Sequence, residues 1–222
     1  MKLTIFGATG GTGQVLVRQA LAEGHDVRAV VRTPGKLAIE HPSLEIVVAD
    51  VVGASPLTST VAGSDAVLSA LGPVGRHDTT SVCTVAIRRI LDAMDSAGVR
   101  RVVALSAQPV LRSGLGEPLW FRSTIRPIIR AVFRNVYADL ERMEGVLRAS
   151  AADWTVLRPP YLTDEPASGH YRSALEASVP TTRISRADLA QAMLDVLRDD
   201  TTIRHALGVG SAKRGKDTSP AR

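Results

Sequence analysis

The feature that most constrains the fold is a glycine-rich turn between a short apolar run and a segment with helical periodicity. The apolar run covers residues 3–6, and the turn reads Gly7-Ala-Thr-Gly10-Gly-Thr-Gly13. Apolar residues then recur at helical spacing over residues 14–23. The alternative interpretation is a glycine-rich hairpin that binds no ligand. Such a hairpin would not explain why a strand precedes the turn and a helix follows it. The order of strand, glycine turn and helix favours a phosphate-binding βα unit.

The glycines have separate predicted roles in this turn. Gly7 permits the sharp bend, Gly10 lets a ligand approach the backbone, and Gly13 lets the helix pack close to the strand. Free N–H groups and the helix dipole at the start of the following helix favour an anion. We therefore expect a pyrophosphate to bind here, and the predicted phosphate-binding residues are Gly7, Thr9, Gly10, Gly11, Thr12 and Gly13.

Strands and helices alternate along the rest of the chain, which is typical of a parallel sheet covered on both faces. This predicts an α/β fold with a doubly wound, Rossmann-type parallel sheet in one domain over residues 1–212. We expect small C-terminal elements on the substrate side, formed by segments of about 108–135 and 161–185, and a basic, mobile tail at 213–222. The expected strands are 3–6, 26–32, 45–51, 65–71, 101–107, 153–161, 171–179 and 204–209, and the expected helices are 14–23, a short one capped by Ser55, 80–98, a helical region reaching 149, and one opened by the capping box Ser185-x-x-Asp188.

The end of the second strand indicates the cofactor. An NAD-binding unit usually carries an acid there, which binds the ribose hydroxyls, but this chain has Arg32. A guanidinium can bind a 2′-phosphate, and Lys36 can add charge, so NADP(H) is expected rather than NAD(H). An arginine that is merely solvated at a strand end is the alternative. Asp50 and Val51, after the third strand, are expected to contact adenine.

Composition excludes several other classes. At 45% hydrophobic and 222 residues, the chain can bury one core. It contains no apolar run of about eighteen residues, and a strand at the start leaves no room for a signal peptide. The single cysteine, Cys83, excludes an internal disulfide, and the five histidines are scattered, so no metal site and a cytoplasmic location are expected.

The positive charge is concentrated in two places. The net charge is +5, with bases gathered in the tail and arginines over residues 100–134. Neither patch carries a nucleic-acid-binding motif, and the arginine-rich region is better explained as a cofactor-proximal or lipid-tolerant surface. The expected partner is a small-molecule substrate, without nucleic acid or membrane, and the expected state is a monomer or homodimer.

These motifs resemble the atypical short-chain dehydrogenase/reductases, and more closely their NmrA-like and flavin reductase (biliverdin-IXβ reductase)-like groups. The resemblance extends over residues 1–198 and rests on the glycine turn and on Arg32, Asp50, Leu71-Gly72, Leu105-Ser106-Ala107 and the segment 158–164. It implies that the turn holds pyrophosphate, that Arg32 holds the 2′-phosphate, and that adenine lies on Asp50 and Val51. It further implies nicotinamide contacts from Ser106, Pro159 and Pro160, and Leu71 and Gly72 beside the cofactor.

The chain departs from its relatives at the positions that bear on catalysis. The Tyr-x-x-x-Lys pair of ordinary short-chain dehydrogenases is absent, because Tyr137 is followed by Glu141 and no lysine lies between Lys36 and Lys213. Tyr161 replaces a histidine that follows the two prolines in biliverdin reductase relatives.

We therefore expect hydride transfer from NADPH to a planar acceptor such as a flavin, a quinone or a conjugated carbonyl. Ser106, at the end of the fifth strand, is expected to point its hydroxyl into the crevice. Tyr161 or Tyr137 is expected to hydrogen-bond a developing oxyanion, although either ring can equally serve packing. An NmrA-like sensor of NADP(H), with a partner surface at 122–134, is the alternative function; an isomerase or dehydratase lacks a paired acid and base.

Overall fold

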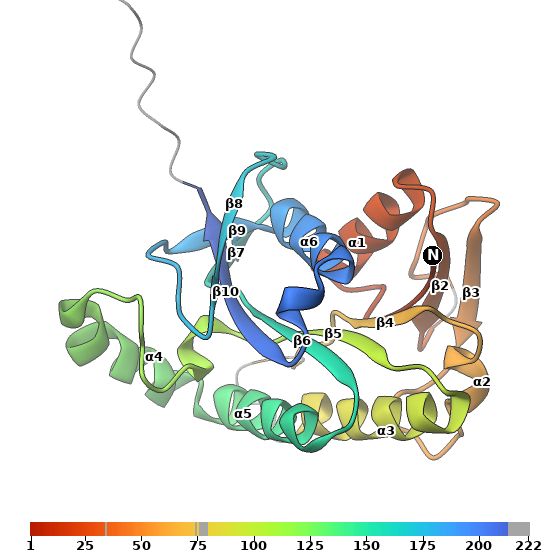
Figure 1. Ribbon diagram of the computed structural model, residues 1–222, viewed down its shortest axis with the longest axis horizontal. Helices are drawn as coiled ribbons and strands as arrows, with labels where there is room; N and C mark the ends of the chain where they lie inside the picture. The colour runs from red at the N-terminus through yellow and green to blue at the C-terminus, as the bar shows by residue number, and fades with distance from the viewer. Residues whose placement is uncertain (34, 74, 76–79, 213–222) are drawn as a thin grey trace, which may run out of the picture.

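The glycine turn joins an interior strand of the sheet, β1 (Lys2–Phe6), to the helix α1 (Gly11–Ala22) in the computed structural model (Figure 1). The structure describes residues 1–33, 35–73, 75 and 80–212. The expected mobile tail at 213–222 lies outside the described residues. Gly7, at φ +78, turns the chain directly after β1.

Within the described residues, one sheet has eight strands, and only its edge strand β8 runs antiparallel to its neighbour. β1 pairs with β2 on one side and β4 on the other, so the direction of strand addition reverses at β1. A ligand crevice forms at the carboxyl ends of the strands where this reversal occurs. The order is β3 (Leu44–Val48), β2 (Asp26–Val31), β1, β4 (Ala66–Ser69), β5 (Arg101–Leu105), β6 (Asp153–Arg158), β10 (His205–Ser211) and β8 (Tyr171–Leu175). The predicted fold class is confirmed.

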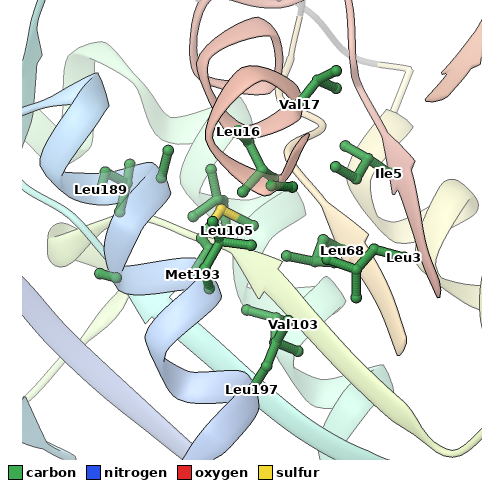
Figure 2. Close-up of a cluster of buried hydrophobic side chains, with 14 of the residues drawn as sticks. Leu3, Ile5, Leu16, Val17, Leu68, Val103, Leu105, Leu189, Met193 and Leu197 are labelled. Carbon is green, nitrogen blue, oxygen red and sulfur yellow. The ribbon is translucent and has the colours of Figure 1, made fainter. Parts of the chain in front are cut away.

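Helices cover both faces of the sheet (Figure 1). α1 and α6 (Arg186–Asp195) lie on one face, and α2 (Thr58–Val61), α3 (Val82–Ala97) and α5 (Arg134–Ala149) lie on the other. β4 and β5 read as nearly continuous apolar runs because their side chains are buried on both sides, and in β1 the apolar run over residues 3–6 is interrupted by the buried Thr4. Figure 2 shows the first of the two cores, where α1 and α6 meet the strands through Leu3, Ile5, Leu16, Val17, Leu68, Val103, Leu105, Leu189, Met193 and Leu197.

The C-terminal elements extend this sheet and add a small second one. β10 pairs in parallel with β6 and antiparallel with β8. β7 (Tyr161–Thr163) and β9 (Arg183–Ser185) form a separate two-stranded sheet. The predicted cap of α6 is confirmed, because the Asp188 amide donates to the Ser185 hydroxyl at 3.0 Å. Asp188 also accepts from the Ser168 and Gly169 amides, which ties the preceding loop to the start of α6.

Several predicted boundaries are wrong. The strand expected at 171–179 ends at Leu175. The third strand ends at Val48, and its apolar residues are partly exposed because β3 lies at the sheet edge. The short helix begins at Thr58 with Leu57 as its cap, so Ser55 does not start it. The sixth strand ends at Arg158, because the two prolines that follow cannot donate ladder hydrogen bonds.

The predicted helical region that reaches residue 149 is confirmed and consists of three pieces. A π-helical turn at Phe121–Ile125 continues into α4 (Arg126–Val132), and α5 follows directly. Figure 1 shows α4 beside the end of α5 and away from the strands of the sheet.

Candidate functional site

The glycine turn at the start of α1 is built so that only glycine fits at its two ends. A Cβ on Gly7 would lie 2.7 Å from the backbone of Ala70, and a Cβ on Gly13 would lie 2.0 Å from the Gly7 carbonyl oxygen. The positive φ of Gly7 adds a second requirement for glycine. The predicted roles of Gly7 in bending and of Gly13 in close packing are therefore confirmed.

The first turn of α1 provides an environment for an anion. Its cap residue, Gly10, has no side chain with which to accept from the helix amides, and no acidic residue lies in the first turn. The first N–H groups of a helix have no partner within the helix, and the helix dipole makes this end positive. The turn therefore fits a phosphate group, as the glycine spacing predicts.

A cavity of about 180 Å³ lies beside this turn, at the carboxyl ends of β1, β2 and β4. Arg32 follows β2 with its side chain exposed, and Val51 forms a buried part of the wall. The Asp50 carboxylate accepts from the Val52 amide at 3.1 Å, which fixes its orientation at the rim. The predicted cofactor residues that line this cavity are Gly7, Thr9, Gly10, Arg32, Asp50, Val51, Leu71 and Gly72.

Other predicted cofactor residues lie elsewhere. Lys36 is exposed and does not line this cavity. Gly11, Thr12 and Gly13 belong to the first turn of α1. Their contacts with a cofactor stay predictions, as does a contribution from Lys36 to binding of the 2′-phosphate.

A second, larger cavity of about 570 Å³ lies at the same edge of the sheet, beyond the ends of β5 and β6. Its walls come from both predicted substrate-side segments and are mostly apolar. Pro159, Pro160, Tyr137 and Tyr161 all line it, so the structure brings the two predicted tyrosines to the two prolines. The other lining residues are Ala107, Gln108, Pro109, Glu117, Pro118, Trp120, Phe121, Ile129, Phe133, Leu162, Val179, Pro180, Thr181 and Thr182.

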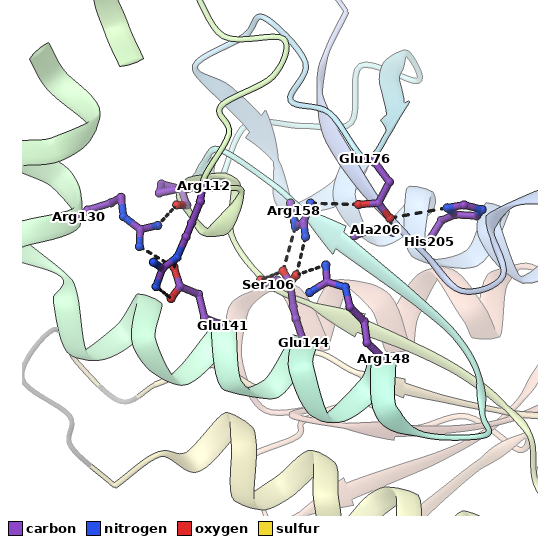
Figure 3. A network of polar contacts seen from close by, with 11 residues as sticks. Ser106, Arg112, Arg130, Glu141, Glu144, Arg148, Arg158, Glu176, His205 and Ala206 are labelled. Atoms are coloured by element: carbon purple, nitrogen blue, oxygen red, sulfur yellow. Dashed lines mark hydrogen bonds and ion pairs between the residues drawn. The ribbon is translucent and has the colours of Figure 1, made fainter. Parts of the chain in front are cut away.

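Ser106 does not point its hydroxyl into this crevice, so that expectation is wrong. Its Oγ donates to Glu144 Oε1 at 2.7 Å, and the Glu144 side chain is 1% exposed (Figure 3). Arg158 donates to the same carboxylate from Nε at 2.9 Å and from its terminal nitrogen at 2.5 Å, and Arg148 adds a third bond. Ser106 therefore completes a buried ionic cluster, and a nicotinamide contact from this residue stays a prediction.

Tyr137 is a neutral phenol in the wall of the larger cavity. Burial raises its pKa, and the positive charge of Arg130 only partly opposes this shift. The residue in the usual lysine position, Glu141, binds Arg112 and Arg130 instead (Figure 3). Burial alone would raise the pKa of Glu141, but the hydrogen bonds from these two arginines outweigh it and lower the pKa. Tyr137 can thus donate a hydrogen bond but lacks a lysine that would favour its ionisation.

Arg186, which sequence reasoning did not select, lies beside the glycine turn. A Cβ on Gly11 would meet the Arg186 Nε at 2.8 Å, so the guanidinium stem borders the start of α1. Its terminal nitrogen donates to Asp164 at 2.6 Å. Sequence spacing cannot show that Arg186, more than a hundred positions after the glycine turn, borders it. The one available signal was that Arg186 directly follows the helix cap Ser185, which fixes the position of its backbone.

Comparison with known proteins agrees with this geometry. The model of a family described as NAD(P)H-binding matches residues 7–200. YhfK of Bacillus subtilis, named an uncharacterized sugar epimerase, is 27% identical over 93% of this chain and 92% of its own length. The oxidoreductase AgnL4 of Paecilomyces divaricatus is 26% identical over 88% of this chain and 79% of its own.

Solved structures share the fold. The oxidoreductase ylbE of Lactococcus lactis superposes with a TM-score of 0.80 at 21% identity, covering 97% of this chain and 93% of its own. A short-chain dehydrogenase/reductase of Veillonella parvula in complex with NADP gives 0.77 at 22% identity, covering 96% and 95%.

We expected an NAD(P)H-dependent oxidoreductase. The family match and the relatives named oxidoreductases confirm this general class of enzyme. The finer likeness to the NmrA-like and biliverdin reductase-like groups stays a prediction. The chain therefore belongs to the family of NAD(P)H-binding proteins whose model matches residues 7–200.

Proposed function

We propose that this protein transfers hydride from NADPH to a planar small-molecule acceptor, such as a flavin, a quinone or a conjugated carbonyl, in the manner of the flavin reductase-like group that its sequence resembles. The observation that carries the proposal is the apolar cavity of about 570 Å³ beside Pro159 and Pro160, at the same sheet edge as the glycine turn. Its size lies in the usual range for small-molecule sites, about 300–1,000 Å³.

The two cavities fit the two ends of a dinucleotide. The smaller one accepts the adenosine end beside Arg32, and the larger one receives the nicotinamide end beside the prolines. NADPH, when bound, supplies the hydride. The protein then has to orient the acceptor and exclude water, which the aromatic rings of Trp120, Phe121 and Phe133 can do by stacking and packing.

The polar groups of the larger cavity suit an acceptor that needs little acid catalysis. Tyr137 can donate a hydrogen bond to an oxygen on which negative charge develops. Glu141 occupies the usual lysine position and is held by two arginines, so a lysine-activated tyrosine does not form. A flavin or quinone accepts hydride without such a pair and can take its proton from water.

Turnover is tested by mixing the protein with NADPH and a panel of flavins, quinones and enones while cofactor absorbance is followed. We expect oxidation of NADPH with at least one class of planar acceptor. Tight NADPH binding without turnover across the panel would contradict the enzyme proposal and favour the NADP(H)-sensing alternative. Capture of a protein partner that depends on NADP+ would then identify such a sensor.

Cofactor preference is tested by the Arg32→Asp variant. Loss of a charge-assisted bond to the 2′-phosphate costs about 1.5–3 kcal/mol, so the Kd for NADPH should rise by about tenfold to a hundredfold while the Kd for NADH changes little. The matched control is Arg18→Asp, which removes an exposed arginine on α1 outside the cavity. An unchanged ratio of the two Kd values in Arg32→Asp would refute the assignment of Arg32.

A further inference from the structure

The helix α4 turns its apolar side toward solvent and its polar side toward the protein, the reverse of a helix that packs on a core. Ile125, the last residue of the π-helical turn, and Ile128 and Val132 of α4 follow the spacing i, i+3 and i+7 and are 39%, 65% and 50% exposed. Such a stripe normally faces the interior. Arg126 is instead the buried residue of this helix, at 9% exposure, and Arg130 is half-buried.

Polar contacts of the arginines explain this orientation. Arg126 pairs with the buried carboxylate of Glu117 at 3.5 Å and donates to a backbone carbonyl of the preceding loop. Arg130 pairs with Glu141 at 2.5 Å and donates to another carbonyl of that loop. These contacts hold the polar side of α4 toward the protein, so the apolar side faces outward.

The π-helical turn extends the exposed stripe by one residue. Its i→i+5 hydrogen bonding places Trp120 about one turn before Ile125, and Trp120 is 62% exposed. We call Trp120, Ile125, Ile128 and Val132 the α4 outer face. Trp120 also lines the larger cavity, so this face and the cavity adjoin. Several large apolar side chains exposed at helical spacing indicate a docking surface.

Charge at the two ends of the outer face selects the kind of partner. Arg122 and Arg134 lie equally far along the chain on either side of Ile128; Arg134 is exposed, and Arg122 is half-buried with its stem beside Gly114 of the preceding loop. Neither guanidinium has an ion pair within the part of the chain that the structure describes. A two-fold pairing of two copies through antiparallel α4 helices would set Arg122 of each copy against Arg134 of the other, and like charges disfavour that arrangement.

We propose that the α4 outer face docks this protein on the surface of a bilayer that contains anionic lipid. An apolar face with tryptophan and aliphatic side chains, bordered by arginines, is the composition of helices that lie in the membrane interface. Arg122 and Arg134 would reach lipid phosphates while the apolar side chains enter the headgroup boundary. Among the described residues, no helix is long and apolar enough to cross a membrane, so the contact is peripheral. This proposal replaces the expectation that the protein has no membrane partner.

Sedimentation of the full-length chain with vesicles tests the proposal. We expect binding to vesicles of phosphatidylcholine mixed with phosphatidylglycerol at low salt, weaker binding at high salt, and little binding to phosphatidylcholine alone. The double variant Ile128→Ser with Val132→Ser should need about tenfold more lipid for half-maximal binding, because two large apolar side chains no longer enter the interface. Its control, Ile46→Ser with Val48→Ser, changes exposed apolar residues on β3 and should bind as the wild type does.

A second pair of variants tests the charge. Arg122→Gln with Arg134→Gln should weaken binding on the order of tenfold, whereas Arg18→Gln with Arg88→Gln removes two exposed arginines elsewhere and should have a smaller effect. Circular dichroism and thermal melting confirm that each variant is folded.

Three results would overturn the proposal. Wild-type protein that stays in the supernatant with anionic vesicles would do so, and so would equal binding by the outer-face variant and its β3 control. The third is a dimer in analytical ultracentrifugation that dissociates in Ile128→Ser with Val132→Ser, because the outer face would then bind a second copy.

Discussion

Tyr137 is the residue in the larger cavity with the clearest chemical role. Its raised pKa keeps the phenol protonated at working pH, so it can act as a hydrogen-bond donor. We predict that Tyr137→Phe lowers kcat on the order of tenfold to a hundredfold, because a donor to a developing oxyanion is lost. Steady-state kinetics with the best acceptor of the panel measure the effect.

The control is Tyr171→Phe, which also removes one hydroxyl but outside the cavity. Tyr171 donates to Asp195 at 2.6 Å, so this variant should lose some stability and keep its kcat. An unchanged kcat in Tyr137→Phe would leave that ring with a packing role only.

His25 should make the stability of the folded protein depend on pH. Burial lowers its pKa, the nearby N-terminal amino group lowers it further, and Glu23 partly opposes both. Below about pH 6.5, the usual histidine pKa, the unfolded chain therefore binds a proton at His25 more readily than the folded protein does. The free energy of unfolding should decrease as the pH falls through this range. Above that pH the full stability is present.

Urea unfolding of the protein with a native N-terminus, at several pH values between about 8 and 5.5, measures this dependence. In His25→Gln the decrease below about pH 6.5 should be smaller. His170→Gln, which removes an exposed imidazole, serves as the control. An identical pH dependence in wild type and His25→Gln would show that His25 does not contribute.

The sequence predicted the positions of some site side chains but not the directions in which all of them point. Arg32 and the glycines follow a fixed strand and turn, so their place beside the small cavity was predictable from spacing. The direction of Ser106 was not, because its partner Glu144 lies on a helix 38 residues later. Position at a strand end located Ser106, but a tertiary hydrogen bond decided where its hydroxyl points.

At the scale of elements, the β1 to α1 turn should tolerate no larger residue at Gly13. A Cβ there would lie 2.0 Å from the Gly7 carbonyl oxygen, a backbone atom that cannot move aside without distorting the turn. We predict that Gly13→Ala costs about 1–3 kcal/mol of unfolding free energy and strongly weakens NADPH binding. Urea unfolding and a fluorescence titration with NADPH measure the two effects.

Gly145, inside α5, provides the matched control. A Cβ there has no neighbour within 4 Å, so Gly145→Ala should stabilise the protein by about 0.5–1 kcal/mol through the better helix propensity of alanine. Wild-type NADPH affinity in Gly13→Ala would contradict the account of the turn.

The elements that sequence predicted best are those with a regular apolar pattern. Periodicity and caps located β1, α3 and α6, because their apolar patterns match their burial. The end of β3 was predicted three residues too late. Where an edge strand stops pairing depends on its neighbour in the sheet, which its own sequence does not show. The orientation of α4 was not predictable either, because pairing of Arg126 with Glu117 reverses the face that hydrophobicity alone would bury.

At the scale of the whole molecule, cofactor binding should raise thermal stability. Binding to the folded state alone contributes about 2.7 kcal/mol at a ligand concentration of a hundred times Kd. For a chain of 222 residues each kcal/mol shifts Tm by about 2–4 °C, so saturating NADPH should raise Tm by about 5–10 °C. Differential scanning fluorimetry measures the shift.

The same NADPH concentration should raise the Tm of Arg32→Asp by less, because its Kd is higher. Absence of any shift in the wild-type protein would contradict both the proposed enzyme and the sensing alternative.

The position of β10 between β6 and β8 has a consequence for synthesis of the chain. β8 precedes β10 in the sequence, but among the described strands it pairs with β10 alone. Until residues 205–211 have left the ribosome, β8 has no strand to pair with, and the outer edge of β6 is open. Pairing of β8 therefore waits for a segment synthesised after it, and a nascent chain stalled before residue 205 would expose an open sheet edge to chaperones.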